Sequence, residues 1–222
     1  MGLLLAATQV EFTTSAFVPI ALGFFGLGTG YLIYGPEELF KLPSRNRAVD
    51  LTTGLWGIWM PGFLQFVTGI YLFAGLTWFH TFRDKPLYMA AVAFTAYGVH
   101  WWAIGMARAL GGDPRPNGFM SVPFIVLSAL GATVFFKADD VPVALLFVGL
   151  TCVYVADFFA SLFQRPPLSD EFGGEPGKPR PTATSELAER GLGLAHIVTG
   201  CWLMYLTVAV TMNTAVSTNL WV

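Results

Sequence analysis

Long apolar segments alternate with short polar connections along this chain. Each segment holds roughly 18–24 residues, the length that a helix needs to cross the hydrocarbon core of a bilayer. The segments are continuously apolar, whereas a strand of an outer-membrane barrel alternates apolar and polar residues over about ten positions. The pattern predicts six transmembrane helices in one bundle, at about residues 17–35, 52–75, 87–107, 119–136, 141–163 and 191–213.

The remaining stretches define the rest of the organisation. We expect an N-terminal lead-in at 1–16, a six-helix transmembrane domain at 17–213 and a C-terminal tail at 214–222. The lead-in has no basic start and carries Glu11, which disfavours a cleaved signal peptide. The connection 164–190 is rich in proline and predicts an extended, solvated loop, for which a functional lid is the alternative.

Composition supports the same class. The 222 residues are 55% hydrophobic and only 12% charged, so the chain is predicted to be an all-α integral membrane protein. The net charge is −2 and the charges lie between the apolar segments, which gives no basic surface for a nucleic acid. Cys152 and Cys201 lie inside apolar segments, and no spacing suits a metal site. Without a nucleophile, phosphate-loop or paired-carboxylate motif, we expect neither an enzyme nor a cofactor.

The third segment carries the most informative helical pattern. At 100° per residue, two faces separate, of which one predicts the lining of a path and the other a packing seam. Ligation of haem or a pigment by His100 or His196 is a further hypothesis, but the sequence lacks histidines paired at matched depth. The lining face holds Phe94, Tyr97, Gly98, Trp101, Gly105 and Arg108, and the small-residue face holds Ala93, Ala96, His100, Ala103 and Ala107.

Glycine, glutamine and proline mark the first two segments. Gly23, Gly26 and Gly30 share one helix face, which predicts close packing of backbones, with a glycine strip along a solute path as the alternative. Gln65 is an amide inside an apolar segment, so it either ties two helices together or contacts a solute. Pro61 is expected to kink the same helix.

Two titratable residues fall at similar depth in the last two segments. Asp157 lies inside the fifth segment, where a carboxylate needs a partner, a proton or water. His196 lies about five residues into the antiparallel sixth segment. We therefore predict an Asp157–His196 interaction, either as a structural pair or as a proton-coupled or pH-sensing pair.

Four stretches in order along the chain resemble the acetate uptake transporters, also called succinate–acetate permeases. Residues 18–23, Val-Pro-Ile-Ala-Leu-Gly, are similar to a degraded Asn-Pro-Ala-Pro-Leu-Gly signature. Residues 61–69, Pro-Gly-Phe-Leu-Gln-Phe-Val-Thr-Gly, are similar to Gly-Gly-x-x-Gln-x-x-Ala-Gly. Residues 93–98, Ala-Phe-Thr-Ala-Tyr-Gly, precede a tryptophan as in the family, and residues 200–213 resemble its last helix around Tyr-Leu.

The resemblance implies a function and an assembly. It implies a ring-shaped homo-hexamer in which each protomer carries a path for a small carboxylic acid such as acetate. The constriction of that path would fall on Leu27, Tyr97 and Leu150, and Gln65 would contact the solute. A constriction of this kind gates by dewetting and favours small, partly apolar solutes.

The departures from the family pattern leave a second function open. The leading asparagine and the second proline of the signature are replaced by Val18 and Ala21, and the acidic residue of the last helix is replaced by Val210. His100 and Asp157 stand where the family has apolar residues, so we read His100 as a packing or partner contact. We therefore predict a channel or proton-linked transporter for small monocarboxylates or another small solute. The alternative is a non-transporting structural or accessory subunit of a larger membrane complex.

Loop charges predict an orientation in the cell (inner) membrane. The connections 36–51, 108–118 and 164–190 hold nine lysines and arginines, against three on the side of the termini. The positive-inside rule then places these three loops in the cytoplasm and both termini outside. The resembling family has cytoplasmic termini, so this prediction differs from the one that the resemblance implies.

Overall fold

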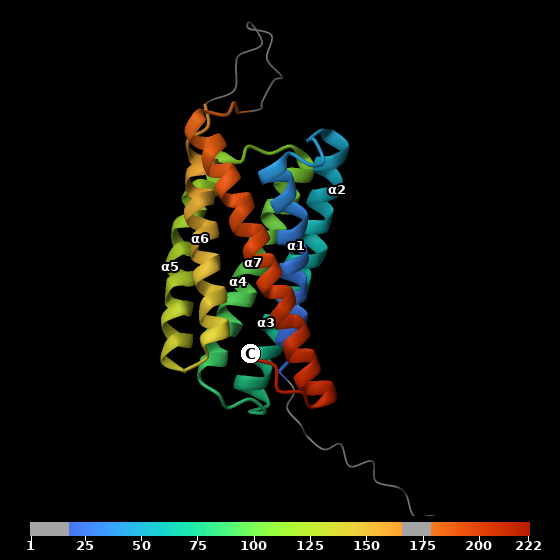
Figure 1. Cartoon of the computed structure of the whole chain (residues 1–222), viewed down its shortest axis with the longest axis vertical. Helices are drawn as coiled ribbons and strands as arrows, with labels where there is room; N and C mark the ends of the chain where they lie inside the picture. Colours follow the sequence, from blue (N-terminus) through green and yellow to red (C-terminus); the bar gives the residue numbers. More distant parts are fainter. Residues whose placement is uncertain (1–17, 166–178) are drawn as a thin grey trace, which may run out of the picture.

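Six long helices make up the part of the chain that the computed structural model describes, residues 18–165 and 179–222 (Figure 1). The predicted lead-in at 1–16 and residues 166–178 of the long connection lie outside the described residues. The helices are α1 (Ile20–Phe40), a continuous helix formed by α2 (Arg47–Gly57), η1 (Ile58–Phe63), α3 (Leu64–Phe73) and η2 (Ala74–Trp78), then α4 (Pro86–Leu110), α5 (Arg115–Lys137), α6 (Val141–Leu162) and α7 (Ala183–Val216).

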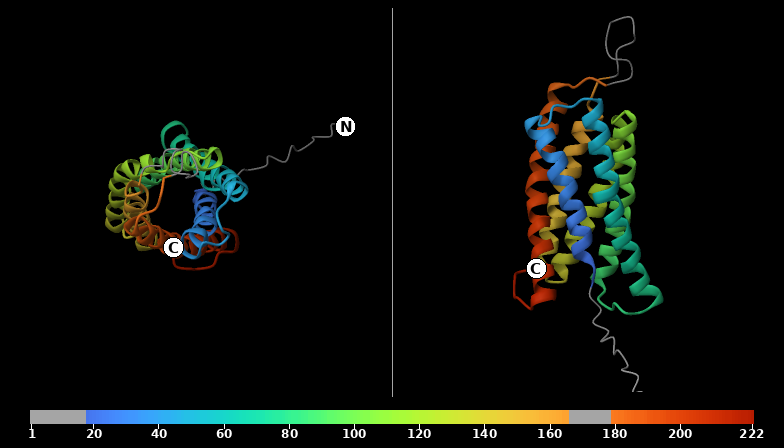
Figure 2. Two further views of the ribbon diagram at one scale, coloured as in Figure 1. Left: turned by 90° about the horizontal axis from the view of Figure 1, so that it is seen from above. Right: turned by 90° about the vertical axis from the view of Figure 1, so that its right-hand side faces the viewer.

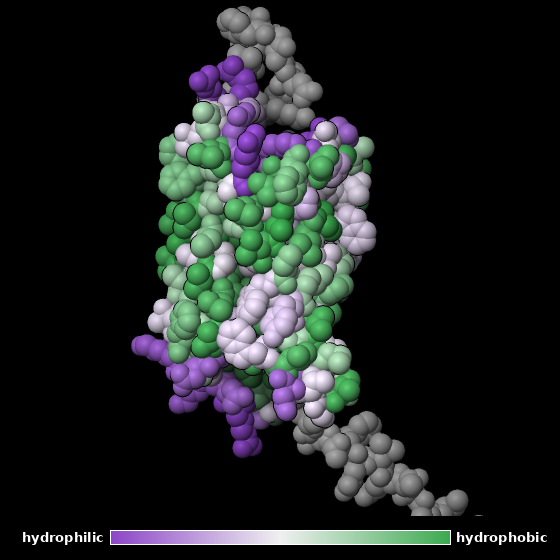
Figure 3. All heavy atoms as spheres, viewed as in Figure 1, coloured by the Kyte–Doolittle hydropathy of each residue, from purple (hydrophilic) through white to green (hydrophobic). Residues whose placement is uncertain are grey.

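The outer surface of the bundle is that of a membrane protein. Five of the six helices are long and apolar enough to cross a bilayer. Only α1 is not among them, because its glycines, tyrosines and the acidic pair near its end dilute its hydropathy. In Figure 3 an apolar belt covers the middle of the visible face, and polar residues gather at both ends. The chain is therefore an integral membrane protein.

The helices form a closed ring within one chain. The helix 47–78 packs between α1 and α4, α4 contacts α5, α5 packs on α6, and α6 packs on α7, which returns to α1. Viewed along the bundle, the six helices surround a common axis (Figure 2). The beginning of α1 and the end of the chain lie at one end of the bundle, which we call the terminal end (Figure 1). The opposite end carries the connections at 41–46 and 111–114, together with residues 163–165 and 179–182.

Close packing of α1 depends on its glycines, as the sequence predicts. A Cβ atom on Gly26 would lie 2.6 Å from the backbone oxygen of Met60, and one on Gly30 would lie 2.6 Å from Cγ of Pro61. Gly23 packs on the ring of Phe94. Because there is no room for a side chain at these positions, they join helices rather than line a solute path.

Pro61 alters its helix, although not as a simple kink. It lies in η1, where the backbone widens into π-helical geometry before α3 resumes the α-helix. A proline lacks the N–H that the α-helical ladder needs, and a local π-helical turn absorbs this defect. Gln65 follows directly in the first turn of α3, with its side chain fully buried.

Several helix ends differ from the predicted boundaries. The first helix continues to Phe40 and the second begins at Arg47, so much of the predicted loop 36–51 is helical. The last helix begins at Ala183 rather than 191, because Thr182 and Ser185 form a capping box. Hydropathy ends a segment at the first charges, whereas a helix continues wherever its polar side chains find partners. The C-terminal residues fold back on α7, where the Tyr205 hydroxyl donates to the backbone oxygen of Trp221 at 2.8 Å.

Candidate solute-permeation site

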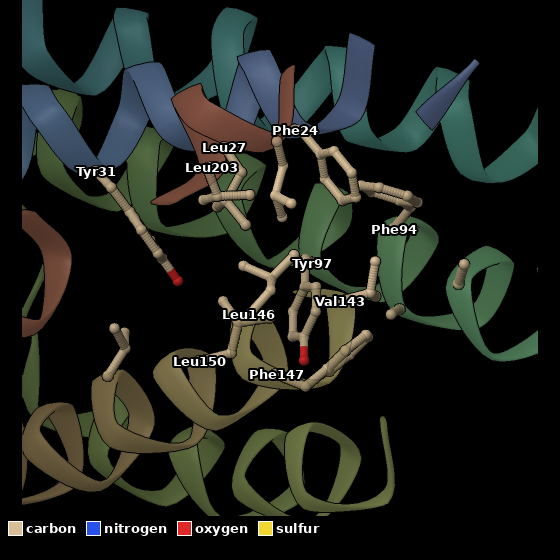
Figure 4. Close-up of a cluster of buried hydrophobic side chains, with 14 of the residues drawn as sticks. Phe24, Leu27, Tyr31, Phe94, Tyr97, Val143, Leu146, Phe147, Leu150 and Leu203 are labelled. Carbon is tan, nitrogen blue, oxygen red and sulfur yellow. The ribbon is translucent and has the colours of Figure 1, made fainter. Parts of the chain in front are cut away.

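Leu27, Tyr97 and Leu150 come together at the centre of the bundle. They project from α1, α4 and α6, and each is only 2% exposed. Figure 4 shows Tyr97 beside Leu150, with Leu27 across from them. The Tyr97 hydroxyl is paired with Ser128 Oγ of α5 at 2.9 Å, which holds the phenol ring in place. The positions that the resemblance assigns to a constriction therefore form one cluster.

An apolar cavity of about 70 Å³ lies on the terminal side of this cluster. Gln65 is a rare polar group in its wall, and its side chain is 0% exposed. Neither amide atom has a hydrogen-bond partner, so the alternative in which Gln65 ties two helices together is not what the structure shows. The lining residues are Ile20, Phe24, Leu27, Gln65, Leu87, Ala90, Ala93, Phe94, Tyr97, Phe135, Asp140, Val143, Leu146, Phe147 and Leu150.

Asp140 adds a titratable group to the end of the apolar cavity. It precedes α6, and its side chain accepts a hydrogen bond from the backbone N–H of Val143 at 3.1 Å. Burial raises the pKa of Asp140 above its ordinary value, and the hydrogen bond from Val143 opposes this rise. The carboxyl is therefore easier to protonate than an exposed aspartate.

A polar cavity of about 170 Å³ lies on the other side of the constriction. Its wall combines aromatic rings with charged or titratable groups from α1, α4, α6 and α7 and from the connection after α1. The lining residues are Tyr31, Tyr34, Glu38, Arg45, His100, Trp101, Ile104, Ala107, Arg108, Gly112, Pro114, Asn117, Val153, Tyr154, Asp157, Ala160, Ser161, Gln164, Glu189, Leu192 and His196.

The two cavities are separated by about one helical turn. They share no lining residue, and on each of three helices a residue of the apolar cavity is followed four positions later by a residue of the polar cavity. Four residues of α-helix span about 6 Å. The layer between the cavities is therefore thin. The three pairs are Leu27 and Tyr31 on α1, Tyr97 and Trp101 on α4, and Leu150 and Tyr154 on α6.

Asp157 and His196 both line the polar cavity, but the structure does not pair them. His196 Nδ1 lies 2.6 Å from Glu38 Oε2, whereas the Asp157 carboxylate accepts hydrogen bonds from Ser121 and Ser161 at 2.7 Å each. The prediction of a direct Asp157–His196 interaction is therefore wrong. The first helix extends beyond its predicted end and carries Glu38 to the side of α7, where Glu38 rather than Asp157 is the partner of His196. No sequence pattern pointed to Glu38 as a partner.

His100 packs inside the chain and lines the polar cavity. Its ring lies against Phe124, with centroids 4.5 Å apart, and its Nδ1 is 3.0 Å from the Tyr154 hydroxyl. The side chain is 4% exposed and its Nε2 has no hydrogen-bond partner. His100 therefore packs within the bundle, and its Nε2 is buried without a partner in the wall of the polar cavity.

A buried charge cluster, which the sequence analysis missed, supports the wall of the polar cavity. Arg108 pairs with Glu37 and lies 3.3 Å from Asp50, while Arg45 reaches both acids from the outside. The Arg108 guanidinium also stacks over the ring of Tyr34, 4.5 Å from its centroid. The cluster ties α1, α2 and α4 together at this end of the bundle.

Comparisons with known proteins support the fold. No protein-family model matches the chain, and no curated protein matches its sequence. A solved structure of the bacterial acetate channel SatP matches with a TM-score of 0.64 at 15% identity, covering 89% of this chain and 93% of that one. At this level of identity the likeness shows a shared fold, which agrees with the resemblance stated from the sequence.

Proposed function

We propose that this protein is a membrane channel or transporter for small solutes, with small monocarboxylic acids as the class to test first. The observation that carries the proposal is the pair of cavities on one axis, separated by the thin layer of Leu27, Tyr97 and Leu150. The shared fold with an acetate channel supports it. A solute would need only a small displacement of side chains to pass between the cavities.

Gln65 has the properties of a solute contact in this proposal. A buried amide without partners carries unmet hydrogen-bonding capacity on both a donor and an acceptor. A small acid, amide or hydroxyl compound entering the apolar cavity supplies both bonds, while the apolar wall accepts its methyl group. The gating role of Leu27, Tyr97 and Leu150 stays a prediction, as does the hexameric assembly.

The test is flux through proteoliposomes. Labelled acetate uptake is measured with and without a pH gradient, and acetamide entry is measured by stopped-flow swelling. We expect wild type to exceed protein-free liposomes, and Gln65→Met to lower the protein-dependent rate by about fivefold, the worth of one hydrogen bond. Thr133→Val, which changes an exposed side chain of α5, is the matched control.

The same measurement separates the alternative function. A structural or accessory subunit would keep the path closed and give no solute entry above protein-free liposomes for any tested compound. That result would overturn the transport proposal and favour a role in binding other membrane subunits.

A further inference from the structure

Almost all of the charged or titratable groups that line the polar cavity have an ionic or hydrogen-bonded partner within the described chain. Glu38 pairs with His196, and Glu189 pairs with Lys41 at 2.6 Å. Arg45 and Arg108 both pair with Glu37 and Asp50, as described above. Each of these groups therefore has a close partner of its own in the cavity wall or behind it.

Asp157 differs from these groups in the kind of partner that it has. Its Oδ2 lies 2.7 Å from the Ser121 hydroxyl and its Oδ1 lies 2.7 Å from the Ser161 hydroxyl, so both oxygens have hydroxyl partners. Within residues 18–165 and 179–222, no lysine, arginine or histidine forms an ion pair with it. The hydroxyls satisfy its hydrogen bonds but leave its charge uncompensated.

His100 supplies the complementary feature in the same wall. Its Nδ1 is held by Tyr154 and its ring by Phe124, so Nε2 is fixed in direction and lacks a partner. A neutral imidazole nitrogen either donates or accepts one hydrogen bond, depending on the tautomer. A hydroxyl, carboxylic acid or amide can satisfy either state.

Resting on the proposed transport function, we propose that the polar cavity admits the solute only in an uncharged form. His100 Nε2 hydrogen-bonds the neutral solute, and Asp157 repels its anion. An anion held about 6 Å from an uncompensated carboxylate, at an effective dielectric of about 20, is disfavoured by about 100-fold. For a weak acid the permeating species is then the undissociated acid, and neutral amides of the same size pass equally.

The experiment compares a neutral solute with an anion in the same protein. Acetamide swelling of proteoliposomes reports the neutral flux. Membrane current in a sodium acetate gradient at pH 8 reports only charged species, so leakage of acetic acid through the lipid does not contribute. Wild type, Asp157→Asn, His100→Phe and His100→Gln are measured, with Asp84→Asn as a control that removes an exposed acid outside both cavities.

We expect acetamide swelling in wild type without acetate current above a protein-free bilayer. Asp157→Asn, which keeps the shape and loses the charge, should raise the ratio of acetate current to acetamide swelling at least tenfold, and Asp84→Asn should leave that ratio unchanged. His100→Phe should slow acetamide entry, and His100→Gln, which restores a polar group, should recover part of the rate.

Two results overturn this inference. One is a wild-type acetate current that matches that of Asp157→Asn, and the other is an unchanged ratio in Asp157→Asn. Absence of both swelling and current in wild type refutes the proposed transport function itself, and with it the inference that rests on it.

Discussion

Replacing Gln65 by methionine should stabilise the protein while impairing solute entry. The side chain is fully buried, and both its amide nitrogen and its amide oxygen lack partners. Each unsatisfied buried group costs about 1–3 kcal/mol. Methionine has nearly the same length and volume but no group to satisfy, so the substitution removes this cost and leaves the packing nearly unchanged.

We expect the free energy of unfolding to rise by about 2 kcal/mol. This value is near the lower end for two unsatisfied atoms, because the methionine side chain is flexible and packs less specifically. For a chain of this size, that corresponds to a rise in Tm of about 4–8 °C. The assay is thermal unfolding in detergent, followed by circular dichroism, together with the flux measurement described above. Leu72→Met is the control, because Leu72 is also 0% exposed on the same helix but carries no polar group.

A lower Tm for Gln65→Met than for Leu72→Met would refute the reasoning. It would mean that the amide is hydrogen-bonded in the membrane, for example to trapped water. The apolar cavity argues against a water there, because a buried water needs two to four polar partners.

Four further substitutions test the constriction, the packing of two glycines and the titration of Asp140. Leu150→Ala should widen the constriction and raise acetamide swelling several-fold, at a stability cost of about 2–5 kcal/mol in thermal unfolding. Gly54→Ala should destabilise by about 1–3 kcal/mol, because its Cβ would lie 2.5 Å from the Gly105 oxygen, whereas Gly191→Ala, with no neighbour within 4 Å, should stabilise by up to about 1 kcal/mol. Asp140→Asn keeps the helix cap and removes the titration. Because burial raises the pKa of Asp140, the folded state binds the proton more tightly than the unfolded state, so the wild type should lose stability relative to the variant as pH rises from about 3 to 7. A difference in Tm between the two proteins that is constant with pH would contradict this.

The helices and the central cluster could be predicted from sequence for a common physical reason. Backbone groups in lipid must be satisfied within the segment, so a long apolar run is nearly always a helix. The resemblance supplied the positions Leu27, Tyr97 and Leu150. These residues meet in the bundle because they lie at the same depth on three helices that run in the same direction. The close packing of Gly26 and Gly30 followed from their size alone.

The polar contacts could not be predicted in the same way. A helical wheel places His100 about 60° from Tyr97, but one helix cannot show how wide the neighbouring cavity is. The partner of His196 depended on Glu38, which a hydropathy window assigns to a loop. Side-chain partners are chosen by three-dimensional proximity, and a charged residue near a helix end can be buried whenever the opposite helix supplies its partner.

The charged residues at this end of the bundle interact differently in the folded protein and in the chain during insertion. Arg108 contributes to the predicted excess of basic residues, yet it is buried against Glu37 and Asp50 and is only 9% exposed. An ion pair in the folded protein carries no net charge that could interact with a lipid surface. During insertion the basic residues are not yet paired, and their charges do interact with it. The positive-inside rule therefore concerns the charges of the chain during insertion. In the folded protein the buried charge cluster has a different role. It braces α1, α2 and α4 around the mouth of the polar cavity and leaves Asp157 as the charge that a solute meets.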